Sequence, residues 1–180
     1  MKPAWLIYLI LLVCQPLFAE DSGKTGNVLL PGTGKSIIDL HVHVAGLGYG
    51  DSGCFINGTM RENFRFPFYL WAMDVTEEKL EEHGDRLVLE QLSAKVAASE
   101  TLPQPVLPAI EGYVTDRGEL ARVKTQDIVP NDFVARETAR TDNLLFGASV
   151  NPNRLDAVER LRAAHASGAV LVKWIPSIMN

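Results

Sequence analysis

The sequence predicts an α/β fold with parallel strands, because strand-like and helix-like segments alternate four times along the chain. Its length and composition agree with one globular domain. The 180 residues are 47% hydrophobic and 22% charged, which suffices for a sizeable core. The net charge is −5 and the chain carries no basic stripe, so the composition argues against nucleic acid as a partner.

Residues 1–19 have the order of a secretory signal peptide. Lys2 precedes an apolar run over residues 4–13, which is too short to span a bilayer comfortably. We expect cleavage after Ala19 and export to the periplasm or the outside of the cell, so that the membrane is a partner only if this segment stays uncleaved. An uncleaved anchor and a lipoprotein acylated at Cys14 are the alternatives.

Residues 20–35 are rich in Gly, Ser and Thr and are predicted to form a linker, which leaves residues 36–180 as the domain. Cleavage of the signal would remove Cys14, and Cys54 would then have no intrachain partner. The exported protein is therefore expected to fold without a disulfide.

The first predicted strand covers residues 37–44. Side chains alternate along a strand, so Asp39, His41 and His43 share one face while the opposite face is aliphatic. Neutral imidazole is a good ligand for divalent metals, and two at this spacing form a chelating pair for zinc or a similar ion. The alternative is an ordinary half-buried pair of histidines that binds no metal.

Glycines at 46, 48 and 50 end this strand and place the histidines at its C-terminal end. Residues 45–73 then form a long loop rich in aromatic side chains, which above a barrel mouth would wall a substrate pocket. Asp74 begins a helix-forming run through Ser99, with a break at Gly84.

The remaining predicted elements follow in the same alternating order. Residues 105–113 form a short apolar strand that ends in Glu111, and residues 130–140 form a helix. A strand over residues 144–150 and a turn at Asn151 lead into a helix over residues 154–167. The apolar spacing of Leu155, Val158 and Leu161 predicts the buried stripe of that helix, and a last strand covers residues 170–175.

The chain resembles the amidohydrolase superfamily of metal-dependent hydrolases, particularly its amidohydrolase-related branch. Three segments carry the resemblance, namely residues 38–43 with their His-x-His, residues 146–152 and residues 168–174. The resemblance implies a TIM-type (β/α)8 barrel, of which this chain holds the first four β/α units. It also implies metal-assisted hydrolysis of C–N or ester-type bonds in a small molecule. Decarboxylation on the same scaffold is the alternative.

In such a barrel the reacting groups lie at the C-terminal ends of the strands. Glu111, Asn151 and Lys173 fall at such ends, beside His41 and His43. The resemblance implies that Lys173 is carboxylated and bridges two metals, although a lysine that reaches into solvent is the alternative. Glu111 and Asn151 are predicted to line the substrate pocket, and no catalytic residue is assigned.

The resemblance further implies metal histidines on the fifth and sixth strands and a catalytic aspartate on the eighth, which this sequence does not contain. We therefore expect the N-terminal half of such an enzyme, inactive by itself. Its two free sheet edges predict self-association. A non-catalytic half-domain that binds a partner or is vestigial is the alternative from a different class.

Overall fold

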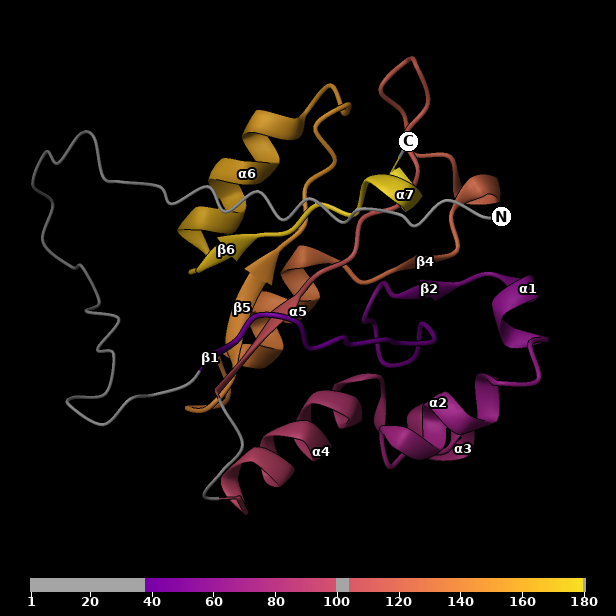
Figure 1. Ribbon diagram of the computed structural model, residues 1–180, viewed down its shortest axis with the longest axis vertical. Coiled ribbons are helices and arrows are strands. Elements are labelled where there is room, and N and C mark those ends of the chain that lie inside the picture. Colours follow the sequence, from indigo (N-terminus) through magenta and orange to yellow (C-terminus); the bar gives the residue numbers. More distant parts are fainter. Residues whose placement is uncertain (1–37, 100–103, 180) are drawn as a thin grey trace, which may run out of the picture. The chain divides into compact units, whose positions relative to one another are not determined.

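The computed structural model describes residues 38–99 and 104–179 (Figure 1). The predicted signal peptide and linker lie outside the described residues. A parallel sheet of four strands forms the centre, in the order β1 (Ile38–Asp39), β3 (Gln104–Pro108), β5 (Leu145–Ala148) and β6 (Leu171–Val172). The sheet is curled into half of a barrel, and the predicted α/β class is confirmed.

Strand β5 pairs with β3 on one side and with β6 on the other. Residues 106–108 of β3 pair with residues 145–147 of β5, and Gly147 pairs with Leu171 of β6. A Cβ atom on Gly147 would lie 3.1 Å from the Cα of Pro108 and 3.1 Å from Leu171 Cδ1. Glycine at this position therefore lets three adjacent strands approach one another.

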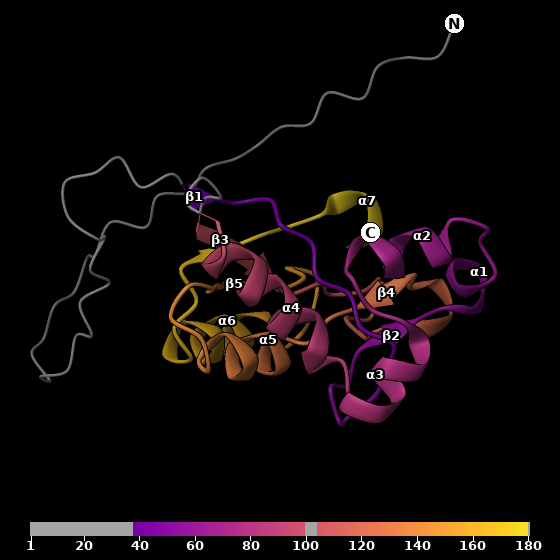
Figure 2. The same ribbon diagram turned by 90° about the horizontal axis from the view of Figure 1, so that it is seen from below.

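Three helices cover one face of this sheet: α4 (Arg86–Ala97), α5 (Asn131–Thr138) and α6 (Ala157–Ala166). Figure 2 shows them in a row on the same side of the strands. Leu107 of β3, Phe133 and Val134 of α5, and Leu89 of α4 are almost fully buried where the two layers meet. The core therefore lies on the helical side of the sheet.

The predicted break at Gly84 is confirmed. Helix α3 (Glu77–His83) begins at the N-cap Thr76, whose side chain accepts the N–H of Lys79, and it ends at Gly84 with a positive φ of 80°. Gly84 also packs closely on Gly50, since a Cβ there would lie 3.1 Å from the Gly50 Cα. The turn between α3 and α4 thus needs glycine for both its conformation and its space.

The predicted long loop over residues 45–73 is wrong, because it contains β2 (Phe55–Ile56), α1 (Gly58–Arg61) and α2 (Phe66–Ala72). Strand β2 pairs antiparallel with β4 (Asp127–Ile128), whose residues lie 71 and 73 positions further along the chain than their partners. Such two-residue strands have no periodicity to read. The local signal for α1 was present, however, since the side chain of Asn57 caps it by accepting the N–H of Met60 at 2.9 Å.

The predicted buried stripe of α6 is also wrong. Leu155, Val158 and Leu161 are 86%, 61% and 42% exposed, and among the described residues of this helix only Ala164 is buried. The apolar spacing correctly indicates an amphipathic helix, but spacing does not say which face meets the sheet. Here Ala164 is the buried side chain, and the three large apolar side chains face outward.

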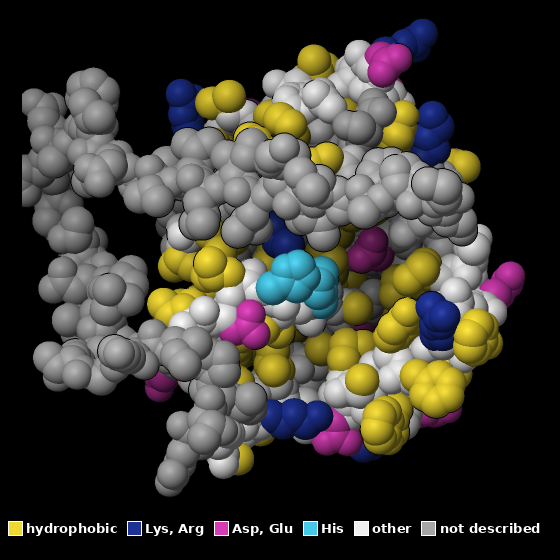
Figure 3. Space-filling model, in the orientation of Figure 1, with side chains coloured by type: hydrophobic (Ala, Val, Ile, Leu, Met, Phe, Trp, Pro, Cys, Tyr) yellow, Lys and Arg dark blue, Asp and Glu magenta, His cyan; other side chains and the backbone are white. Residues whose placement is uncertain are grey.

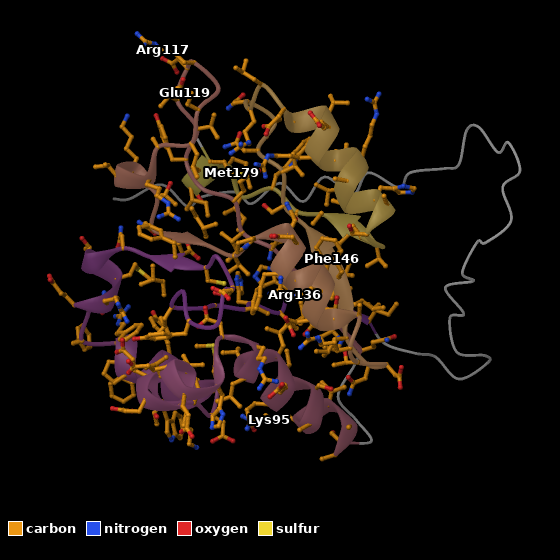
Figure 4. The ribbon with its side chains drawn as sticks, turned by 180° about the vertical axis from the view of Figure 1, so that it is seen from behind. Lys95, Arg117, Glu119, Arg136, Phe146 and Met179 are labelled. Carbon is orange, nitrogen blue, oxygen red and sulfur yellow. The ribbon has the colours of Figure 1, made fainter. Side chains whose placement is uncertain are left out.

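Two short elements complete the fold, the 3-10 turn η1 (Arg122–Lys124) and helix α7 (Pro176–Met179). The segment between β3 and β4 extends away from the sheet, and Arg117 and Glu119 lie at its tip (Figure 4). Within the described residues, no helix has the length and apolar character needed to cross a membrane.

Candidate metal centre

The histidine pair lies just beyond β1 and outside any assigned strand. The predicted strand over residues 37–44 ends at Asp39, whose Oδ1 accepts the backbone N–H of His41 at 2.9 Å. This local bond competes with the sheet ladder for the same N–H group and ends the strand. The prediction that residues 40–44 belong to the strand is therefore wrong.

The two imidazoles nevertheless lie together, as their spacing predicted. Their Nε2 atoms are 2.9 Å apart and their ring centroids 4.7 Å apart, with the rings at 72° to one another. Histidine side chains gather at the centre of the face in Figure 3, and His41 and His43 are both exposed. At this separation one Nε2 donates a proton and the other accepts it.

The same separation suits a shared metal ion. Zinc–nitrogen bonds are ~2.0–2.1 Å long, so two nitrogens on one ion at right or tetrahedral angles lie ~2.9–3.4 Å apart. Burial lowers the pKa of His43, and the nearby Lys173 and His41 lower it further. The neutral imidazole, which carries the lone pair that a metal needs, is therefore favoured at this position.

Lys173 lies immediately after β6 and extends its pairing, since its backbone N–H donates to the carbonyl of Ala148 at 2.8 Å. Its Nζ is buried and is the one buried side-chain nitrogen or oxygen without a hydrogen-bond partner in the described part of the chain. Burial lowers the pKa of this amine, and the Asp39 carboxylate opposes that change. Lys173 thus brings an unpaired amine close enough to His43 and Asp39 to act on them electrostatically.

Asp85 holds the segment that follows the histidines, and sequence reasoning missed it. This carboxylate is fully buried and accepts the N–H of Leu47 at 2.9 Å, the N–H of Gly48 at 2.8 Å and the hydroxyl of Ser52 at 2.5 Å. Gly46 passes so close that a Cβ there would lie 2.5 Å from Asp85 Oδ2. In sequence, Asp85 indicates only the start of a helix, and no signal connects it with a segment about forty residues earlier.

The side chain of Asn151 forms hydrogen bonds with backbone groups. Its Nδ2 donates to the carbonyls of Gly112 and Met179, at 3.2 and 2.7 Å, and its Oδ1 accepts the N–H of Asn153. Its own N–H donates to Glu111 Oε2 at 2.5 Å. Asn151 therefore ties α7 to the end of β3 and the following turn, and its contact with a substrate stays a prediction.

Glu111 is buried and forms ion pairs with Arg154 at 3.3 Å and Arg160 at 3.7 Å. It lines a cavity of about 500 Å³ beside α6, together with both arginines and the apolar side chains of Phe146 and Ala164. In Figure 4, Phe146 lies beside α5 on the helical face of the sheet. Among the described residues, no hydrogen bond or ion pair joins Glu111 or Asn151 to the histidine pair.

Within residues 38–99 and 104–179, no group of three or more His, Cys, Asp or Glu side chains is arranged to hold a metal. The candidate centre is therefore the histidine pair with Lys173, a residue that becomes an oxygen ligand only when carboxylated. Glu111 and Asn151 form a separate polar cluster.

Comparisons of this chain with models of protein families, with curated proteins and with solved structures found no match. The relation to the amidohydrolases stays a prediction that rests on the three sequence segments.

Proposed function

We propose that the protein is a metal-dependent hydrolase that acts on C–N or ester-type bonds of a small molecule, with His41, His43 and Lys173 as metal ligands. The observation that supports it best is the juxtaposition of two Nε2 atoms 2.9 Å apart with a buried, unpartnered amine. A buried amine without a partner is costly, so it indicates a group that is missing from its surroundings.

A carboxylated Lys173 would remove that cost. The neutral amine attacks the carbon of carbon dioxide, forms an N–C bond and releases one proton, which leaves a carbamate whose single negative charge is shared by its two oxygens. Burial favours the neutral amine that this step requires, because desolvation lowers the pKa of Lys173. The carbamate oxygens and the two imidazoles would then hold a divalent ion, zinc foremost.

A bound divalent ion supplies Lewis acidity that activates water and polarises the scissile bond. The chain's own residues prepare the site for it. Partial burial lowers the pKa of His43 and so favours its neutral form, and the Asp39 carboxylate accepts the backbone N–H of His41. Asp85 fixes the segment from Leu47 to Ser52, so the histidine segment is anchored on its C-terminal side.

Metal content tests the ligand assignment. The purified chain should bind zinc, measured by mass spectrometry of the metal after dialysis, and a His41→Ala/His43→Ala variant should lose it. The matched control is His83→Ala/His165→Ala, which removes the two other histidines, located on α3 and α6. Equal zinc content in the parent and the His41/His43 variant would refute the assignment.

The role of Lys173 has a separate readout. With ¹³C-labelled bicarbonate, a carbamate signal should appear in the parent NMR spectrum and be absent from Lys173→Arg. Hydrolysis of a panel of simple amides and esters, with zinc and bicarbonate present, then tests the activity itself. Turnover would support the hydrolase directly, whereas zinc binding without turnover on any ester or amide would keep the ligand assignment and match the expectation that this chain is inactive by itself.

A further inference from the structure

The two outer strands of the sheet present free edges. In the described part of the chain, β1 pairs only with β3, and β6 pairs only with β5. Large apolar side chains are exposed at both edges. Leu40 follows β1 and is 46% exposed, while Val170 and Val172 on the β6 side are each 42% exposed. Unpaired strand edges with exposed apolar side chains are surfaces that pair with another chain.

The apolar surface continues from β6 onto the helical layer. Helix α6 lies beside β6 in both views (Figures 1 and 2), and the side chains of Leu155, Val158 and Leu161 are exposed on or just before it. Trp174, which follows β6, is exposed as well. The β6 side of the sheet is therefore unpaired along its edge and apolar in its surroundings.

The geometry points to a second copy of this chain as the occupant: we propose that β6 of each copy pairs with β1 of the other and closes an eight-stranded parallel barrel. All four strands run in the same direction and follow one another in chain order. A two-fold axis parallel to the strands keeps all directions parallel and places β6 beside β1 at two equivalent seams. Closure of the curled sheet removes both free edges at once.

Closure has a consequence for the candidate metal centre. In a parallel barrel the C-terminal ends of all strands surround one mouth. The strands of the second copy would therefore cover the open side of the histidine pair. They would also bring a second histidine pair to the same end of the barrel. The association itself depends on the sheet edges and holds whether or not a metal binds.

Crosslinking of the full chain tests which edges meet. In a Cys14→Ser background, Leu40→Cys/Val172→Cys should give a covalent dimer on a denaturing gel after treatment with a short thiol crosslinker. The single variants Leu40→Cys and Val172→Cys should give none, because the two-fold axis places identical residues on opposite sides of the barrel. The control pair is Leu40→Cys/Val123→Cys, since Val123 is 99% exposed and lies on η1, which is not part of the four-stranded sheet.

Light scattering measures the association itself. The parent should be a dimer. Val172→Lys should raise the dissociation constant of the dimer by roughly tenfold or more, since a charge at a strand edge opposes pairing. Val123→Lys introduces the same charge at a different site and should leave the dimer unchanged. Circular dichroism checks that both variants fold, and the crosslinking result does not depend on either of them.

Two outcomes would overturn the proposal. A parent chain that is monomeric over the whole concentration range shows that the edges do not pair. Equal crosslinking of the Leu40/Val172 and Leu40/Val123 pairs shows that association uses another surface, such as the apolar run over residues 4–13.

Discussion

Replacing Asp85 by alanine should destabilise the fold by about 2–4 kcal/mol, because the change leaves the buried Ser52 hydroxyl and two part-buried N–H groups without an acceptor. A fully buried donor costs about 1–3 kcal/mol when it is left unpaired, and a donor that water can reach costs less. Two of the donors are the N–H groups of Leu47 and Gly48, at 2.9 and 2.8 Å, which are part-buried, so water can replace some of the lost bond energy. The third donor is the hydroxyl of Ser52, which can rotate, so its share lies at the lower end of the range. The total is large against the ~5–15 kcal/mol that stabilises a typical domain.

Urea unfolding followed by circular dichroism measures this loss. Ser52→Ala removes the rotatable donor and also the hydroxyl oxygen that accepts the N–H of Cys54 at 3.1 Å, so it should cost about 1–2 kcal/mol. Asp116→Ala is the control, since Asp116 is an exposed carboxylate in the segment between β3 and β4 and should change stability by less than about 0.5 kcal/mol. If Asp85→Ala unfolds within about 0.5 kcal/mol of the parent, the carboxylate does not hold the segment after the histidines and the argument fails.

Three further predictions concern stability and reactivity. Leu107→Ala, at a fully buried position, should cost about 2–5 kcal/mol in urea unfolding, whereas Leu155→Ala, at an exposed one, should change stability by less than about 0.5 kcal/mol. Burial raises the pKa of Asp127, so its charged form is disfavoured in the folded state and stability falls as pH rises through the folded pKa. Asp127→Asn should therefore raise the urea midpoint at pH 7 and leave it unchanged at pH values where the carboxyl is protonated in both states. Burial raises the pKa of the Cys54 thiol to about 12, so in a Cys14→Ser background a thiol reagent at pH 8 should react with Cys54 only after denaturation.

From the sequence we could predict that strands and helices alternate along the chain, but not how the helices pack on the sheet. Strands β3 and β5 and the break at Gly84 were predictable, because buried apolar runs and a glycine that ends a helix are local signals. The β2–β4 pair joins residues that are 71 and 73 positions apart, and two-residue strands leave no pattern from which such a pairing could be predicted. The orientation of α6 was not predictable either. Leu155, Val158 and Leu161 define one face of a helix, but their spacing does not say whether that face packs on the sheet or meets solvent.

The candidate site also has features that the sequence predicted and features that it did not. Period-two spacing predicted that His41 and His43 share a side, and their Nε2 atoms are in contact even though the strand ends before them. Spacing could not predict the bond from Asp39 to the His41 N–H, which competes with the sheet, or the buried state of the Lys173 amine. The Asp39 bond is local but leaves no mark in the period-two pattern, whereas the buried state of the amine depends on the tertiary surroundings.

The link between Lys173 and the histidines follows from the curvature of the sheet. Lys173 belongs to the β6 edge and the histidines to the β1 edge, with β3 and β5 between them. In a flat sheet three strand spacings separate these edges by ~14 Å, a distance at which exposed charges are largely screened. Lys173 nevertheless lowers the pKa of His43, and Asp39 acts on Lys173 in turn. Because the sheet is curled, side chains at its two edges lie nearer to one another than they would in a flat sheet, and we expect the curvature that would close a barrel also to bring the members of the candidate metal centre together.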